Sequence, residues 1–490
     1  MKKTLNSPLL IILLALSLSL VYCNTGEDSK KIKNVIIMIP DGTSSALLTL
    51  ARWYNDNNPL AVDPYICGMI KTHNANGTFP DSAPAATAYA TGVKSNPPYI
   101  GLNSDAEPQV SVLELARRKG LATGVVATSQ FAHATPAAFV CHLNAREDRG
   151  VGAFKNLAKQ FIYNSPNLVF AGGEQHLHDN GYAHLLQPNK IRLITDKKAF
   201  DDTKILTDSL LWALFPDCQD STNFMSYECD RNTTNAPSLS EMTAKAIDLL
   251  NQNKKGFFLM VEGSQIDWAA HGNDLYAAVT EFVEFDKAVA KAIEFAKKNK
   301  NTVVIIAPDH GTGGITIGNH LTSKTYSRTP IRSIIDSLKK APWSAKRLAR
   351  MQADSARKSL QTCIGWTTGG HTAEDVFLAI YAPKNARKIT GVIDNSEIGQ
   401  YIAKILNLGD LSKATQELFS KHTAFFSSDE IAIQNADSLV VRKNGRKFTF
   451  FSNTNKLKIN GEQEVRLPSI AVHINGIYYL PRSPHYTPGR

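Results

Sequence analysis

The sequence is poor in cysteine, which excludes a domain held together by a disulfide scaffold. Its 490 residues include six cysteines, and none of them has the Cys-x-x-Cys spacing of a zinc ribbon. Cys67, Cys141 and Cys363 lie in apolar surroundings, where buried and chemically inert thiols are expected. Cys218 and Cys229 are close together in a polar stretch, so they form the candidate disulfide in an oxidising compartment.

Beyond residue 23 the sequence also lacks any run of ~20 apolar residues that could cross a bilayer as a helix. The apolar run 8–22 follows Met1-Lys2-Lys3, and it is short, so residues 1–23 are expected to be an export signal. Two interpretations of Cys23 stay open, because residues 20–22 loosely resemble a lipobox: it accepts a lipid, or the signal is cleaved nearby. The protein is then periplasmic or secreted, with membrane anchoring as a lipoprotein in the first case.

Acidic residues are outnumbered, which favours anionic partners. The chain has 44 Asp and Glu against 54 Lys and Arg, a formal net charge of +10. This excess is diffuse, so no specific nucleic acid partner is expected. The exception is 321–360, where ten basic residues face two acidic ones. This segment is interpreted either as a solvated helical hairpin or as a basic collar that attracts anionic substrate or caps a dimer.

Short apolar runs alternate with amphipathic helical patterns along most of the chain. This alternation predicts an α/β fold with a mainly parallel central sheet, flanked by helices on both faces. Functional residues are expected at the carboxyl ends of the strands. A helical insertion at about 312–368 interrupts this alternation of strands and helices. The predicted strands are 35–39, 121–127, 257–261, 302–307 and 376–381, and the clearest helices are 112–119 and 275–298.

The pattern changes after Leu408, and residues 409–490 are predicted to be a small, β-rich C-terminal appendage. A short helical piece at 411–421 precedes five strand-like runs between 438 and 481. Asn-Gly pairs at 444–445, 460–461 and 475–476 are typical of tight hairpin turns. No residues with site chemistry are apparent in this part of the sequence.

Acidic residues and histidines follow several of the predicted strands. Asp41 directly follows the first strand, and Asp309-His310 follows the strand that ends near Ala307. A single aspartate in such a place often caps the next helix. Two of them, one joined to a histidine, favour a metal site.

Further candidate ligands surround a third strand end. Glu262 ends that strand, and Asp267 and His271 are four residues apart, so on a helix they share one face and can bind one ion. By itself this spacing is also common on solvated helix faces. His371 precedes another strand. Carboxylates together with imidazoles suit zinc, and an oxygen-rich remainder suits magnesium.

Ser82 begins an Ala-rich segment that is predicted to be helical, with Pro84 in its first turn. An anion at this serine would face the free backbone N–H groups of the helix N-terminus. Taken alone, the segment favours an ordinary N-cap serine over a catalytic one.

Together these motifs resemble the alkaline phosphatase family, in the family's order, over about residues 34–408. The resemblance implies a catalytic domain at 31–408 that hydrolyses phosphate monoesters through a phosphoserine at Ser82. Inorganic phosphate would be product and inhibitor, and the protein would be a homodimer with two Zn²⁺ and one Mg²⁺ per subunit. The implied ligands are Asp267, His271 and His371 for one zinc, Asp41, Asp309 and His310 for the other, and Asp41, Thr135 and Glu262 for magnesium.

The resemblance also assigns residues around the phosphate. Arg146 matches the family's phosphate-gripping arginine, whose planar fork suits two phosphate oxygens. His133 and Trp268 occupy positions next to the ligands where some members have Asp and Lys, so this chain lacks the lysine cation that those members have near the phosphate. Two alternative functions remain open: a phosphodiesterase of the same superfamily, and a non-catalytic surface protein that binds phosphate or metal.

Overall fold

The computed structural model describes residues 31–144, 151–206, 210–215, 225–233, 236–318 and 364–487. Several predicted features lie outside these ranges, and what was predicted for them stays a prediction. They are the export signal with Cys23, most of the insertion at about 312–368, Cys218, Cys363 and Arg146. Among the described residues, no helix combines the length and the apolar character that crossing a membrane requires.

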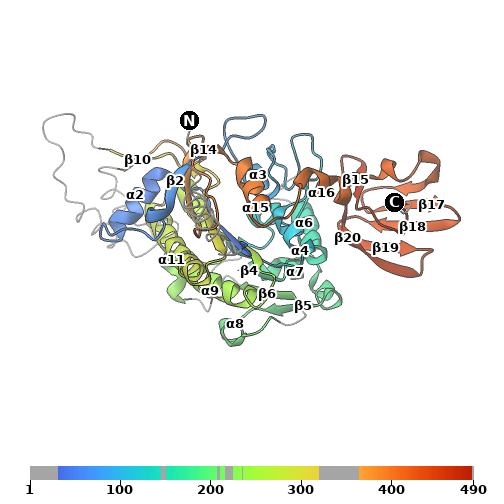
Figure 1. Ribbon diagram of the computed structural model, residues 1–490, viewed down its shortest axis with the longest axis horizontal. Helices are drawn as coiled ribbons and strands as arrows, with labels where there is room; N and C mark the ends of the chain where they lie inside the picture. Colours follow the sequence, from blue (N-terminus) through green and yellow to red (C-terminus); the bar gives the residue numbers. More distant parts are fainter. Residues whose placement is uncertain are drawn as a thin grey trace, which may run out of the picture.

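A ten-stranded sheet with the order β14-β2-β13-β8-β1-β7-β3-β4-β6-β5 forms the centre of the molecule (Figure 1). All five predicted strands are present in it, and every pairing is parallel except those of β13 with β8 and β2. The mainly parallel sheet is therefore confirmed. Its strands are β1 (Asn34–Pro40), β2 (Ile66–Lys71), β3 (Ala122–Gln130), β4 (Leu168–Gly172), β5 (Ile191–Ile194), β6 (Leu210–Phe215), β7 (Phe257–Gly263), β8 (Thr302–Ile306), β13 (Val376–Tyr381) and β14 (Gly391–Asp394).

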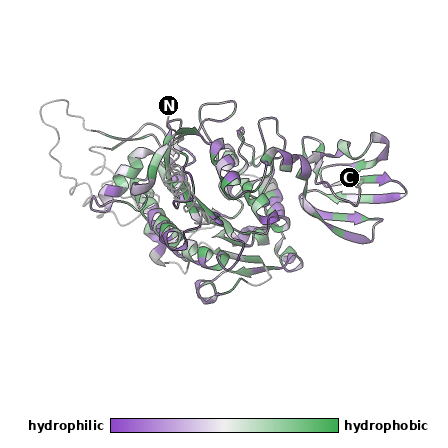
Figure 2. Cartoon of the chain, viewed as in Figure 1, coloured by the Kyte–Doolittle hydropathy of each residue, from purple (hydrophilic) through white to green (hydrophobic). Residues whose placement is uncertain are grey.

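Helices cover both faces of this sheet, because its central strands are apolar on both sides. In β1, Val35, Ile37 and Ile39 belong to one hydrophobic cluster, and Ile36 and Met38 belong to the other. In Figure 2 the central strands are coloured mainly as hydrophobic, whereas the outer helices carry both colours. The first cluster includes residues of α3 (Ser82–Thr91), α4 (Val112–Arg118), α6 (Val151–Tyr163) and α15 (Ser396–Ile405), and the second includes residues of α2 (Ser45–Tyr54), α9 (Leu239–Leu250), α10 (Gln265–His271) and α11 (Leu275–Asn299).

Small elements complete this part of the chain. Two short antiparallel pairs, β9 with β12 and β10 with β11, stand at the two ends of the predicted insertion. The remaining elements are the helices α5 (Ala134–Ala138), α7 (Glu174–Asp179) and α8 (Lys197–Asp202) and the strands β9 (Gly311–Thr312), β10 (Ile315–Ile317), β11 (Ile364–Trp366) and β12 (His371–Thr372).

The C-terminal part forms a second, seven-stranded sheet at one end of the molecule (Figure 1). All three Asn-Gly pairs have positive φ at both residues, as tight hairpin turns require. Gln160 of α6 donates to the Asn453 side chain at 2.9 Å, which links this sheet to the catalytic part. The elements are α16 (Leu411–Leu418), β15 (Ser420–Lys421), β16 (Ile431–Gln434), β17 (Ser438–Lys443), β18 (Arg446–Phe451), β19 (Thr454–Ile459), β20 (Gln463–Ile474) and β21 (Ile477–Leu480).

The helix that begins at Ser82 is held by a very close contact with α15, and this contact gives a first prediction. A Cβ atom on Gly399 would lie 2.5 Å from the Gly92 nitrogen and 2.9 Å from the Tyr89 carbonyl oxygen. Gly399→Ala must therefore move one helix against the other, at a cost of about 1–3 kcal/mol in the free energy of unfolding. Gly77→Ala is the control, since its Cβ would meet no atom within 4 Å. Equal unfolding midpoints in denaturant for the two variants would contradict this packing.

Candidate active site

Most of the predicted site residues meet at the carboxyl edge of the central sheet. β1 lies between β7 and β8, and all three strands are parallel, so Asp41, Glu262 and Asp309 emerge at the same edge. β13 runs in the opposite direction, and its start is therefore at this edge too. That reversal brings His371, which lies before β13, to the residues that follow the parallel strands.

Asp267, His271 and His371 form the first cluster. Asp267 and His271 lie on α10, and the Asp267 Oδ2 atom is 3.3 Å from His271 Nε2. The Nε2 atoms of His271 and His371 are 3.1 Å apart. All three side chains offer one ligand atom within 4.8 Å of the others, as one shared cation requires.

In His271 and His371, the hydrogen bond made by Nδ1 determines whether Nε2 carries a proton or a lone pair. His271 Nδ1 lies 2.6 Å from the Gly369 carbonyl, and His371 Nδ1 lies 2.9 Å from the Pro80 carbonyl. A carbonyl only accepts, so each Nδ1 carries the proton and each neutral ring presents a lone pair at Nε2. Two lone pairs and a carboxylate that face one point repel each other, and a divalent cation relieves that repulsion.

The second cluster surrounds Ser82. His310 Nε2 lies 3.2 Å from Ser82 Oγ, 3.2 Å from Asp309 Oδ2 and 3.7 Å from Asp41 Oδ1. Both aspartates and the histidine are fully buried, and Ser82 is 2% exposed. Asp81 is the N-cap of α3 and accepts from the Ala83 N–H, so Ser82 is the first residue of that helix.

Asp267 joins the two clusters, which the sequence did not indicate. It lies within 4.8 Å of ligand atoms of Asp41 and His310 as well as of the two outer histidines. Thr312 was missed entirely: its hydroxyl donates to Asp267 Oδ1 at 2.6 Å and lies 3.3 Å from His310 Nδ1. Its one sequence signal is its place two residues after His310, in the segment that follows β8.

The backbone is also unusually close between these clusters. Gly42 has φ +72°, and a Cβ atom there would lie 2.7 Å from the Asp267 Cα. The Gly42 N–H donates to Asp309 Oδ1 at 3.1 Å. Glycine at this position therefore lets the turn after Asp41 lie directly against α10.

A third group of oxygen atoms lies deeper, around Glu262 and Thr135. Asp41 Oδ1 and Oδ2, Thr135 Oγ1 and Glu262 Oε1 are buried without a hydrogen-bond partner. Unsatisfied buried oxygens of this kind are costly in an apolar interior. An all-oxygen donor set suits a hard cation such as Mg²⁺.

The pKa values in the site reflect this concentration of charge. Burial, followed by the negative charges of Asp309, Asp267 and Glu262, raises the pKa of Asp41 well above its ordinary value. Burial raises the pKa of Glu262 to about 7, although nearby hydroxyls of Ser264 and Thr135 lower it. Desolvation opposes ionisation of Asp267 too, but contact with the His271 imidazole, together with the nearby imidazoles of His310 and His371, lowers its pKa below its usual range.

The remaining predicted residues have mixed outcomes. The rings of His133 and Trp268 are in edge-to-face contact, with centroids 5.3 Å apart, so these two residues do lie side by side. Arg146 lies outside the described residues. Among the described residues Cys229 has no disulfide partner, and because Cys218 lies outside them, the disulfide stays a prediction.

Comparisons with known proteins agree with this geometry. Residues 32–408 match the family described as alkaline phosphatase. Alkaline phosphatase 4 of Bacillus subtilis is 35% identical, over 78% of this chain and 90% of its own length. The repressible alkaline phosphatase of Saccharomyces cerevisiae is 29% identical over 86% of this chain and 90% of its own length.

Solved structures give the same result. The alkaline phosphatase of the Antarctic bacterium TAB5 is similar with a TM-score of 0.61 and 28% identity, over 78% of this chain and 100% of that one. The cold-active alkaline phosphatase of Shewanella sp. has a TM-score of 0.63 and 28% identity, over 76% of this chain and 99% of that one. The chain therefore belongs to the alkaline phosphatase family and is a phosphoric monoester hydrolase.

Proposed function

We propose that this enzyme hydrolyses phosphate monoesters through a phosphoserine at Ser82, in a site that holds two Zn²⁺ and one Mg²⁺. The observation that carries the proposal is the place of Ser82 Oγ, 3.2 Å from His310 Nε2 and beside the buried carboxylates. A serine whose only role was helix capping would have no need of such neighbours. In α3 the N-cap is Asp81, whose side chain accepts from the Ala83 N–H.

The chain's own residues suit both halves of the reaction. His310 Nδ1 faces the Gly311 carbonyl at 3.2 Å, so Nε2 presents its lone pair on the side of Ser82, where it is available to a metal ion. Ser82 Oγ forms the new bond to phosphorus, the ester P–O bond breaks, and the alcohol leaves with a proton. Water then attacks phosphorus, which releases inorganic phosphate and restores the serine hydroxyl. Throughout, the phosphoryl oxygens face the N-terminus of α3, whose free N–H groups favour anions.

Three ligand sets would hold the metal ions. Asp267, His271 and His371 would bind the first zinc, Asp41, Asp309 and His310 the second, and Asp41, Thr135 and Glu262 the magnesium. When bound, these cations supply the positive charge that favours serine ionisation and stabilises anionic oxygens on both sides of phosphorus. Support comes from the Nε2 lone pairs that converge in the first set and the unsatisfied buried oxygens of the third.

The wider assignments are proposals of the same kind. Arg146 would bind two phosphate oxygens through its planar guanidinium. We further propose the division into an export signal at 1–23, a catalytic domain at 31–408 and a C-terminal appendage at 409–490. Export would make the enzyme periplasmic or secreted, with a lipid anchor if Cys23 is modified, and it would act as a homodimer.

Ser82→Ala tests the nucleophile. It should lower kcat for p-nitrophenyl phosphate by more than about 10³-fold, because it removes the hydroxyl that takes the phosphoryl group. In the wild-type enzyme, mixing with substrate at low pH should trap acid-stable phosphoserine at position 82, seen by mass spectrometry. Ser45→Ala, at an exposed serine on α2, should keep both activity and the trapped phosphate. A Ser82→Ala enzyme with normal turnover would refute the proposal.

Trp268→Lys tests the residue that stands where some relatives have a cation. An ammonium near the bound anion should tighten competitive inhibition by inorganic phosphate, by about tenfold for one charged contact of ~1.4 kcal/mol. Trp268→Gln removes the ring without adding charge, and it should not tighten inhibition. The same inhibition constant for both variants would show that the position does not face phosphate.

The raised pKa of Glu262 predicts how the metal-free protein responds to pH. Between its ordinary value and about 7, the folded state holds a proton that the unfolded state has lost, so the free energy of unfolding falls as pH rises. From pH 5 to pH 8, metal-free wild-type protein should therefore lose more stability than metal-free Glu262→Gln. Thermal unfolding after chelation measures both, and added Zn²⁺ and Mg²⁺ should restore the wild type at pH 8. If the stability of the two proteins depends on pH in the same way, the raised pKa of Glu262 is contradicted.

A further inference from the structure

The nucleophile and its nearest partner come from separate parts of the fold. Ser82 begins α3, which packs on one face of the sheet, whereas Asp309 and His310 follow β8. Their side chains meet at 3.2 Å between Ser82 Oγ and His310 Nε2. Some contact between α3 and the end of β8 must set that distance, because the two segments share no backbone ladder.

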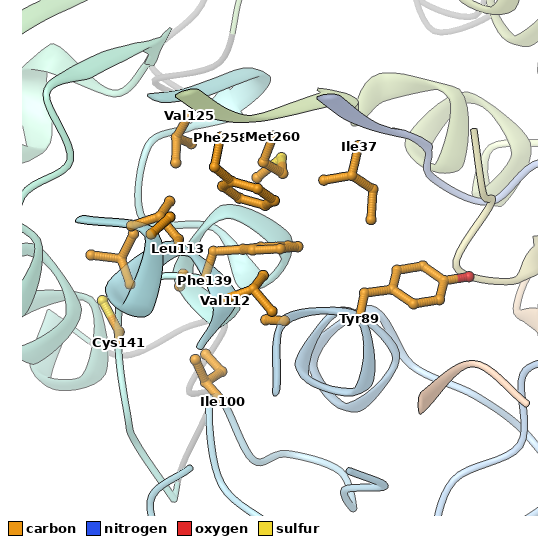
Figure 3. Close-up of a cluster of buried hydrophobic side chains, with 14 of the residues drawn as sticks. Ile37, Tyr89, Ile100, Val112, Leu113, Val125, Phe139, Cys141, Phe258 and Met260 are labelled. Atoms are coloured by element: carbon orange, nitrogen blue, oxygen red, sulfur yellow. The ribbon is translucent and has the colours of Figure 1, made fainter. Parts of the chain in front are cut away.

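Tyr89 makes such a contact. It is fully buried on α3, and its hydroxyl donates to the Pro308 carbonyl at 2.6 Å. Tyr89 is seven positions after Ser82, which is close to two helical turns, so both residues lie on the same face of α3. Figure 3 shows the Tyr89 ring at the margin of the apolar cluster that contains Ile37 and Phe139, with its hydroxyl pointing away from them.

Pro308 lies where the backbone bonding between β8 and β1 ends. β8 ends at Ile306, and among the described residues the last backbone hydrogen bond to β1 comes from the Ala307 N–H, which donates to the Met38 carbonyl at 3.0 Å. Pro308 has no N–H of its own. The next two residues are Asp309 and His310, so the tyrosine holds the backbone directly before them.

The other end of α3 is anchored as well. Gly92 ends the helix and packs against Gly399 of α15. The Thr87 hydroxyl accepts from the Gly101 N–H at 3.0 Å. These contacts hold the C-terminal end of α3, and the Tyr89 bond links the same helix to the turn after β8.

We propose that Tyr89 is a positioning residue, whose hydrogen bond to Pro308 holds the Asp309-His310 turn in register with Ser82. This inference rests on the proposed function, because it assumes that Ser82 is the nucleophile and that Asp309 and His310 bind zinc. It assigns to Tyr89 no contact with substrate. Burial raises the pKa of Tyr89 well above its ordinary value, so the hydroxyl stays a donor at alkaline pH.

Tyr89→Phe, compared with Tyr478→Phe, tests the proposal. Tyr478 is a matched control: it is also fully buried, and its hydroxyl donates to the Asn435 carbonyl at 2.8 Å, in the C-terminal sheet. Both variants lose one hydroxyl and leave one carbonyl unsatisfied, so a merely structural effect should be similar in the two.

Two measurements separate positioning from stability. Competition of metal-free protein with a zinc chelator should show that Tyr89→Phe binds zinc about 10- to 100-fold more weakly than the wild type. This is the loss typical of mutating a residue that orients a metal ligand. At saturating zinc, kcat/KM for p-nitrophenyl phosphate should fall about 10- to 100-fold, because a small misplacement of the nucleophile is costly. Tyr478→Phe should keep the wild-type value of both.

Tyr89→Phe that matches Tyr478→Phe in zinc affinity and in kcat/KM would overturn the proposal. If Tyr89→Phe fails to fold, Tyr89→Trp replaces it, since the indole N–H donates from a different position and the same losses are expected. Trapping of phosphoserine in the wild type separates the two hypotheses. Without that adduct the proposed function itself fails. If the adduct forms and Tyr89→Phe keeps its zinc affinity and kcat/KM, only the positioning role of Tyr89 is refuted.

Discussion

The site depends on mutual repulsion among buried groups that face one small volume. Asp41, Glu262 and Asp309 are fully buried at the same edge of the sheet, and several of their oxygen atoms have no hydrogen-bond partner. The imidazoles of His271 and His371 add lone pairs directed at each other. Isolated buried charge is among the most expensive features of a folded protein. Cations that neutralise such an arrangement stabilise it, so the same repulsion that costs folding energy produces affinity for metal.

The scaffold tolerates this repulsion because the strands that carry it are held from every side. β1 pairs with β7 and β8, and its side chains enter the hydrophobic clusters on both faces. The reversed direction of β13 brings His371 to this edge, from a segment that would otherwise lie at the opposite one. The buried acidic residues therefore stay close together despite their repulsion, because the strands that carry them are packed in one position.

Much of this could be predicted from sequence, because the strongest signals were local. The apolar run before Asp41, the spacing of Asp267 and His271, and the Asn-Gly turns each depend on neighbours in the chain, and the structure has all of them. Strands such as β2 and β5 were missed because their residues are partly exposed and lack a continuous apolar run. Thr312 and Tyr89 were missed for another reason: each acts through a partner that only the fold brings near.

Tyr89 also shows why the sheet alone is insufficient for the chemistry. The carboxylates follow parallel strands, so ladder hydrogen bonds fix them relative to one another. Ser82 belongs to a helix, and nothing in the ladder limits its distance from His310. A helix packed only by apolar contacts can shift slightly at little cost, whereas phosphoryl transfer tolerates little displacement of the nucleophile. A directional bond from that helix to the turn after β8, across 219 positions of sequence, supplies the constraint that non-directional packing cannot.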